Sequence, residues 1–194
     1  METGAQTAAA VVPWCSCCTE DLRTRTGPDR TQKFILIDRR CHNSGQAASP
    51  SECPSSIRGR SIGNHREVAQ SIERVFPERA GCSMSVTHCS VLEQAKCFRA
   101  ADLILGVEGA GLTNMLFSQR GTTVVNLHPN ASFSTLQSDC GQSYYWHMAG
   151  STGMHYHAYM MSNFSFGGSL DDDDTIAIRD FERFLAELRT QMAL

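Results

Sequence analysis

Two short apolar runs, Leu103–Val107 and Thr122–Leu127, constrain the fold of this chain more than any other feature. Each run has the length and composition of a buried strand. A Gly-Ala-Gly turn at 109–111 lies between them, followed by an apolar i, i+3, i+4 helical pattern that begins at Leu112 and stops before Gly121. Parallel strands require such a crossover connection. The sequence therefore predicts an α/β fold with a parallel sheet and flanking helices.

The Gly-Ala-Gly turn is the first candidate binding site. Glycine lets the backbone come close to a ligand, and the first N–H groups of the following helix are unpaired and partly positive. A phosphate or diphosphate fits such a turn. The alternative is that the glycines only permit the turn and close packing of helix on strand. The order of Gly106, Gly109 and Gly111 is not G-x-G-x-x-G, which argues against a nicotinamide or flavin site.

Size and charge limit the classes of function. With 194 residues, the chain has room for one domain with a sizeable core but not for two complete lobes. Hydrophobic residues make up 41% of it and charged residues 19%, as in ordinary globular proteins. A net charge of −3 argues against nucleic acid or an anionic membrane as a partner, so any anion site must be local.

We expect a poorly ordered lead-in at 1–32, which lacks periodicity, and a single domain at 33–194. No apolar run reaches the roughly 20 residues that span a bilayer, and the N-terminus lacks the basic flank of a signal peptide. Nine cysteines and Asn-x-Ser triplets at Asn130 and Asn163 point weakly to an oxidising compartment. The odd number leaves at least one cysteine unpaired.

None of the clusters of ligating residues is expected to hold a metal. The Cys-x-Cys-Cys group at 15–18 lacks a second pair at zinc-site spacing, so disulfide-bonded or free thiols are expected. His155 and His157 alternate on a predicted strand, where solvent exposure is the simpler interpretation. Asp171–Asp174 directly precedes an amphipathic helix over 178–192, whose N-terminal dipole favours acidic residues.

Basic residues follow the first clear strand, Lys33–Asp38, at its carboxyl end. Ligands of open α/β sheets bind outside such ends, where the guanidinium groups of Arg39 and Arg40 can grip a diphosphate. A solvated basic strand end is the alternative.

The helix predicted after Arg60 has its inner face at 68, 72 and 75. Asn64 and Glu67 have the spacing of a cap at its start, whereas Arg60 has no such structural explanation and is the better ligand contact. Met84–Thr87 predicts a short strand. A second capping box, Ser90-Val-Leu-Glu93, then opens a helix on which residue 94 is a surface position by its spacing.

The segment A-D-L-I-L-G-V-E-G-A-G-L-T-N-M-L-F, followed by G-T-T-V-V-N-L-H-P, resembles the signature of glycosyltransferase family 61. The family includes plant N-glycan xylosyltransferases, xylan arabinosyl- and xylosyltransferases and animal lumenal O-linked N-acetylglucosaminyltransferases. The resemblance runs from about Lys33 to about Tyr159. Glu108 stands where the family usually has His.

The resemblance implies a Rossmann-like domain similar to the C-terminal lobe of a two-lobed, GT-B type glycosyltransferase. It implies transfer of a sugar from a UDP-sugar to a protein or glycan hydroxyl, with inversion and without a metal cofactor, in the lumen of the Golgi or endoplasmic reticulum. The implied diphosphate contacts are Arg39, Arg40, Arg60, Gly109, Ala110, Gly111, Leu112, Thr113 and Asn114, and the implied sugar or ribose contacts are Glu108, Asn64 and Glu67. The catalytic base is not assigned, and the acceptor is expected on an N-terminal lobe that this chain lacks.

Two alternatives remain from the sequence. A non-catalytic or degenerate UDP-sugar-binding module would keep the glycine turn but would not transfer the sugar. Glu108, where the family usually has His, is the feature that favours this alternative. Dinucleotide-dependent oxidoreduction is a distant third.

Overall fold

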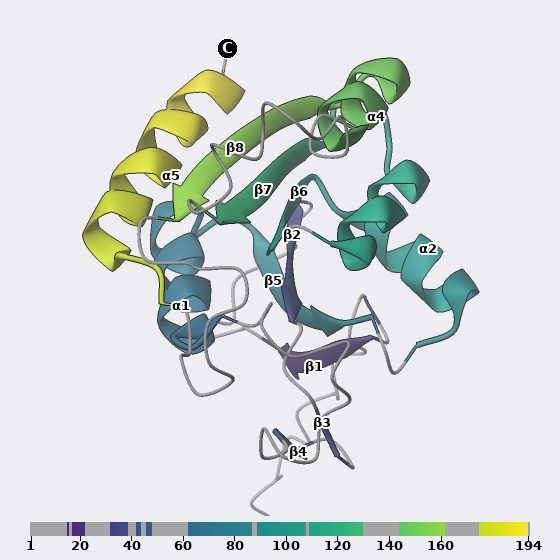
Figure 1. Cartoon of the computed structure of the whole chain (residues 1–194), viewed down its shortest axis with the longest axis horizontal. Coiled ribbons are helices and arrows are strands. Elements are labelled where there is room, and N and C mark those ends of the chain that lie inside the picture. The colour runs from purple at the N-terminus through teal and green to yellow at the C-terminus, as the bar shows by residue number, and fades with distance from the viewer. Residues whose placement is uncertain are drawn as a thin grey trace, which may run out of the picture.

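The computed structural model describes residue 15 and residues 17–21, 32–38, 42–43, 46–47, 62–86, 89–107, 109–129, 144–161 and 175–193. Its centre is a six-stranded sheet in the order β1-β5-β2-β6-β7-β8 (Figure 1). The strands are β1 Cys18–Asp21, β2 Lys33–Asp38, β5 Ala80–Ser85, β6 Leu103–Val107, β7 Thr123–Pro129 and β8 His155–Met161. All pairs are parallel except β1 with β5 at one edge. The α/β, Rossmann-like parallel sheet is therefore confirmed.

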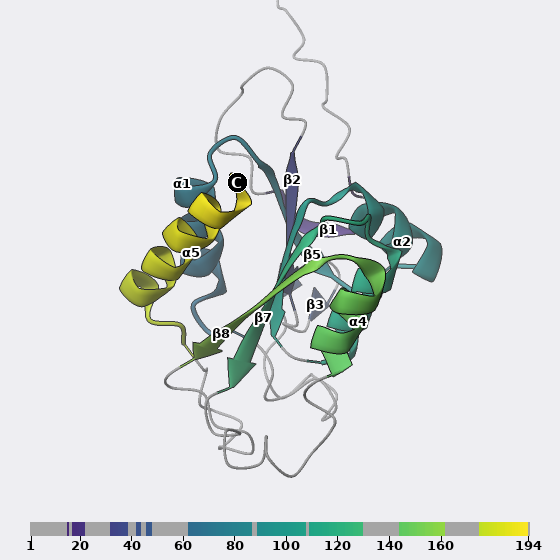
Figure 2. The ribbon, with the colours of Figure 1, turned by 90° about the horizontal axis from the view of Figure 1, so that it is seen from above.

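Helices cover both faces of the sheet, as Figure 2 shows from above. One face carries α1 (His65–Val75) and α5 (Ile178–Met192), and the other carries α2 (Val91–Ala100), the 3₁₀ helix η2 (Ala110–Phe117) and α4 (Tyr144–Thr152). A separate pair of short strands, β3 (His42–Asn43) and β4 (Gln46–Ala47), is antiparallel. Among the described helices, none is both long and apolar enough to cross a bilayer.

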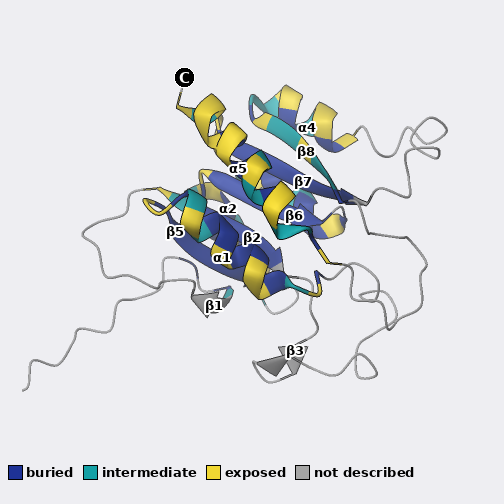
Figure 3. Cartoon of the chain, turned by 90° about the vertical axis from the view of Figure 1, so that its left-hand side faces the viewer, coloured by how far each residue is buried: buried dark blue, intermediate teal, exposed yellow. Residues whose placement is uncertain are grey.

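Two hydrophobic cores result from the alternation of side chains along each strand. In β2, Phe34 and Leu36 face the α1–α5 layer, whereas Ile35 and Ile37 face the α2–η2–α4 layer. The central strands are therefore buried on both faces (Figure 3), which explains why they read as continuous apolar runs. The C-terminal helix is confirmed as well, because its predicted apolar stripe is buried in the first of these cores.

The lead-in predicted to be poorly ordered is partly structured. Cys18–Asp21 pairs with β5 as strand β1, and disulfides link this strand and the two described cysteines before it to other parts of the chain. These bonds are Cys15–Cys97, Cys17–Cys89 and Cys18–Cys82. The prediction was wrong for these residues because covalent links replace the hydrophobic periodicity that the segment lacks.

Local sequence patterns predict the start of α2 correctly but not the start of β5. The capping box is confirmed, since the Ser90 side chain accepts from the Glu93 N–H and the Glu93 carboxylate accepts from the Ser90 N–H. Strand β5 starts at Ala80 rather than at Met84. Its first residues include Ala, Gly and Ser, which have low strand propensity, and burial between β1 and β2 decides their conformation instead.

Candidate functional site

The strand order changes direction between β2 and β6. The chain goes from β2 outward to β5 on one side and then continues through β6, β7 and β8 on the other. In open α/β sheets, ligands bind outside the carboxyl ends of the strands at such a switch point. The Gly-Ala-Gly turn follows β6 at this point, and the residues that come after β2 in the sequence lie outside the described residues. The topology therefore places the predicted turn where this class of sheet binds ligands.

The two glycines of the turn have different structural roles. Gly109 has φ 151°, a conformation that other residues rarely adopt, so the backbone itself requires glycine there. A Cβ built on Gly111 would lie 3.4 Å from Cγ2 of Ile37 and from Cγ2 of Val86. Gly111 thus lets η2 pack closely on the carboxyl end of β2. Ala110, between them, is exposed, so the turn remains accessible from outside.

The helix after the turn is a 3₁₀ helix, not the α-helix predicted. The Leu112 N–H donates to the Gly109 carbonyl at 2.8 Å, an i to i+3 bond. With three residues per turn, Leu112 and Met115 share one side and are fully buried, while Leu116 turns outward and is 49% exposed. The predicted i+4 position therefore does not belong to the apolar face.

Asn114, on the second turn of η2, is held by a buried glutamine. Its Nδ2 donates to Oε1 of Gln94 at 2.5 Å, and Nε2 of Gln94 donates to the carbonyls of Val86 and Cys89. Only 8% of Gln94 is exposed, so its assignment as a surface residue from helical spacing was wrong. The reason is that its side chain bonds to the main chain at Val86 and Cys89, before α2, and to Asn114.

Asn64 and Glu67 lie at the start of α1, which begins at the same edge of the sheet because it follows β2 and precedes β5. The predicted side-chain cap is wrong: Asn64 makes no cap bond. Its Oδ1 instead accepts from the Ile176 N–H and its Nδ2 donates to the Ile176 carbonyl, both at 2.9 Å. Nδ2 also approaches Oε2 of the exposed Glu67 at 3.3 Å. Asn64 therefore joins α1 to the segment before α5.

The family model described as Glycosyltransferase 61 matches residues 4–125, a range that contains β2, α1, β6 and the whole of η2. The chain belongs to glycosyltransferase family 61. This confirms the resemblance seen in the sequence and makes the chain a member of a transferase family.

Two other comparisons add little to the family assignment. A search of curated proteins gives no match. Among solved structures, an azoreductase from Bacillus anthracis str. Sterne is similar with a TM-score of 0.47 and 8% identity, over 80% of this chain and 99% of that one. A likeness this weak carries no implication for function.

Several residues implied by the family 61 signature lie outside the described residues, namely Arg39, Arg40, Arg60 and Glu108. The described members lie at the carboxyl edge of the sheet, in η2 on one face and at the start of α1 on the other. Thr113 and Asn114 are half-buried there, and Leu112 is buried in the core between sheet and helices.

Strand β7 carries two buried polar residues on one face that none of the sequence motifs indicated. Asn126 and His128 are on the same face as Val124, toward η2 and α4, and are 0% and 4% exposed. Nδ2 of Asn126 donates to the Tyr156 hydroxyl at 3.0 Å. Alternate polar positions in an otherwise apolar strand were the signal that could have found them.

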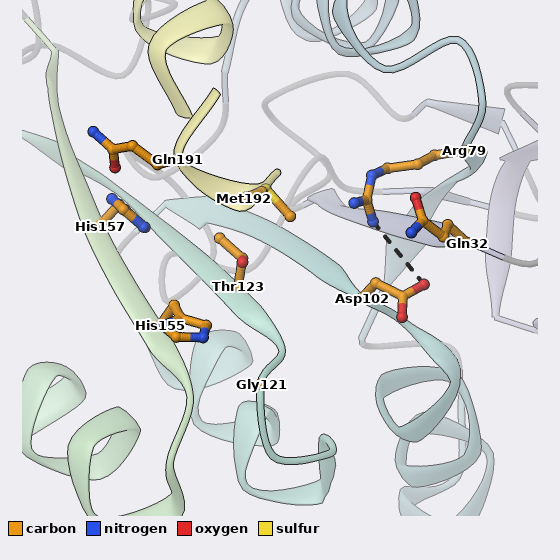
Figure 4. Close-up of a pocket in the computed structure, with 9 residues that line it drawn as sticks. All are labelled: Gln32, Arg79, Asp102, Gly121, Thr123, His155, His157, Gln191 and Met192. Atoms are coloured by element: carbon orange, nitrogen blue, oxygen red, sulfur yellow. Dashed lines mark ion pairs between the residues drawn. The ribbon is translucent and has the colours of Figure 1, made fainter. Parts of the chain in front are cut away.

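A cavity of about 430 Å³ lies at the opposite, amino edge of the sheet (Figure 4). Thr123 and His155, the first residues of β7 and β8, mark this edge. The cavity also holds Arg79, 4.0 Å from Asp102, and His157, whose pKa is lowered by burial and then by His155. Parallel α/β sheets bind ligands at the other edge, so this cavity does not coincide with the switch point.

The cysteines show no arrangement suited to a metal within the described part of the chain. There are two groups of three cysteines in which the sulfurs lie within 4.8 Å of one another. Each of these sulfurs belongs to one of the three disulfides. The predicted strand with His155 and His157 is confirmed as β8, with the first histidine exposed and the second half-buried.

Proposed function

We propose that this family 61 chain binds a UDP-sugar at the carboxyl edge of its sheet and transfers the sugar, a hexose or a pentose, to a protein or glycan hydroxyl with inversion. The observation that carries the proposal is the place of the Gly109–Asn114 turn. It follows β6 at the switch point, packs against Ile37 near the end of β2, and lies within the range that the family model matches.

The turn suits a diphosphate because its N–H groups can stabilise negative charge. A diphosphate gains negative charge as the glycosidic bond breaks, so groups already directed at it stabilise the transition state. Backbone N–H groups of Ala110 and Gly111 at the start of η2, and the Thr113 hydroxyl, are suitable donors. Arg39 and Arg40 come directly after β2 in the sequence and supply positive charge in the proposal. With Arg60, they take the part that a divalent cation plays in metal-dependent transferases.

The hydroxyl groups of the donor need acceptors, which Glu67 and Glu108 supply in this proposal. Glu67 is exposed at the start of α1, on the same edge as the turn. Asn64 is tied to Ile176, so its contribution is to fix the start of α1. A carboxylate at about 4 Å from a phosphate is unfavourable by about 4 kcal/mol at an effective dielectric of 20. Glu108 is therefore assigned to a ribose or sugar hydroxyl and not to the diphosphate.

The acceptor and the catalytic base belong, in this proposal, to an N-terminal lobe of the GT-B type. The secretory lumen is the proposed compartment, and three disulfides within the described residues support it because such bonds persist in oxidising surroundings. A non-catalytic UDP-sugar-binding module is the second candidate, favoured by Glu108 in place of the usual histidine.

Calorimetric titration with UDP, UDP-sugars and NAD separates these functions. We expect UDP and at least one UDP-sugar to bind, with slow release of free sugar. Binding without any turnover would support the module, whereas NAD binding without UDP binding would refute both. The variant Glu108→His tests the assignment of that carboxylate: UDP affinity that rises more than tenfold would show that Glu108 opposes the diphosphate.

A further inference from the structure

One buried amide connects three segments at the carboxyl edge. Nε2 of Gln94, in α2, donates to the carbonyl oxygens of Val86 and Cys89 at 2.9 and 2.8 Å, and Oε1 accepts from Nδ2 of Asn114. The first two partners lie between β5 and α2, and the third lies on η2. Gln94 therefore fixes η2 relative to the end of β5.

These partners also determine which way each amide faces. A main-chain carbonyl can only accept, so both carbonyls must meet the nitrogen of Gln94, which leaves its oxygen for Asn114. Asn114 must then present its nitrogen to Gln94. Gln94 uses neither the Oδ1 nor the second N–H of Asn114. Among the described residues, no other group hydrogen-bonds to the Asn114 side chain.

We propose that Gln94 is a positioning residue of the donor site, and that it makes Asn114 contact the UDP-sugar through Oδ1, which accepts a hydrogen bond from a hydroxyl of the ribose or of the transferred sugar. A hydroxyl suits this oxygen because it can donate, whereas an ionised diphosphate has no proton to donate. The inference rests on the proposed function. It changes the role of Asn114 in that site from a diphosphate donor to a hydroxyl acceptor.

The test compares three ligands, inorganic diphosphate, UDP and a UDP-sugar, on the variants Gln94→Met and Asn114→Leu. Both variants should weaken UDP-sugar binding about tenfold, the effect of one lost hydrogen bond, and leave diphosphate within twofold. An equal loss for UDP would identify a ribose hydroxyl, and unchanged UDP binding would identify a hydroxyl of the sugar. An equal loss for diphosphate would overturn the inference, since Asn114 would then serve the phosphates.

Gln119 provides a matched control. Its Nε2 donates to the Arg99 carbonyl at 2.9 Å, so it also joins the chain after η2 to α2, but it is exposed and makes no hydrogen bond to the Asn114 side chain. Gln119→Met should leave all three affinities within twofold. UDP-sugar binding could instead weaken as much in this variant as in Gln94→Met. Binding would then depend on the general attachment of η2 to α2 and not on the bond between Gln94 and Asn114, which would overturn the positioning role.

Folding and function are separated by two further measurements. Thermal melting identifies a variant that has lost its fold, and Asn114→Leu, at a half-buried position, carries the test if Gln94→Met unfolds. The side-chain ¹⁵N–¹H signals of Gln94 should shift in Asn114→Leu, and unchanged signals would contradict the hydrogen bond itself. A wild-type chain that binds neither diphosphate nor UDP-sugar would refute the proposed function, whereas binding of both that is unaffected by Gln94→Met would refute this inference alone.

Discussion

Replacement of Gly106 by alanine is expected to destabilise the fold by about 1–3 kcal/mol, because the added methyl group has no room. A Cβ built on Gly106 lies 2.8 Å from Cδ1 and 3.1 Å from Cβ of Ile37. Ile37 must therefore move, and it also lies 3.4 Å from the Cβ position of Gly111, at the start of η2. The displacement is thus passed to the proposed donor site, and UDP affinity should fall together with stability.

A double-mutant cycle measured by urea denaturation tests this reasoning. Ile37→Val removes Cδ1 and alone should cost about 0.5–1.5 kcal/mol. The double variant Gly106→Ala/Ile37→Val should lose at least about 1 kcal/mol less than the sum of the single losses. Gly150→Ala is the control, because a Cβ there meets nothing within 4 Å and Gly150 is helical, so stability should be equal or higher. Additive losses, or a Gly106→Ala change below about 0.5 kcal/mol, would refute the packing argument.

Three further predictions concern the fold and its dependence on conditions. Asn64→Ala should lower the free energy of unfolding by about 2 kcal/mol, since two hydrogen bonds to the Ile176 backbone disappear, and an unchanged urea midpoint would contradict this. Reduction of the three disulfides should lower Tm strongly, because each bond closing a loop of 64 to 82 residues is expected to contribute about 2–4 kcal/mol; a Tm that does not respond to reductant would contradict their pairing. Burial holds the pKa of His157 below its unfolded value, so its contribution to stability is complete above the unfolded pKa near 6.5 and is lost as the pH falls below it. His157→Gln should therefore make the free energy of unfolding depend less on pH between pH 7 and 5. An unchanged pH dependence would show that His157 does not contribute to it.

The parts of the fold that the sequence predicts are those with a local signal. The unit β6–η2–β7 follows from two apolar runs and a glycine turn, and α5 follows from a sustained 3.6-residue period. The capping box at Ser90 depends only on residues three positions apart. In each case, the residues that carry the pattern also make the contacts.

The parts that the sequence did not predict depend on distant contacts. Asn64 has the spacing of a cap, but its amide bonds to Ile176, 112 residues away, and two backbone partners outweigh one local bond. Gln94 has the spacing of a surface residue, yet the chain near Val86 covers it. Strand β1 depends on disulfide pairing, which composition cannot specify.

The most direct test of the donor site is a backbone amide chemical-shift map during titration with UDP. The proposal predicts the largest shifts at Ala110 and Gly111, whose N–H groups at the start of η2 meet the diphosphate. The largest shifts at Gly121 and His155 would contradict it, because these residues line the cavity at the amino edge of the sheet.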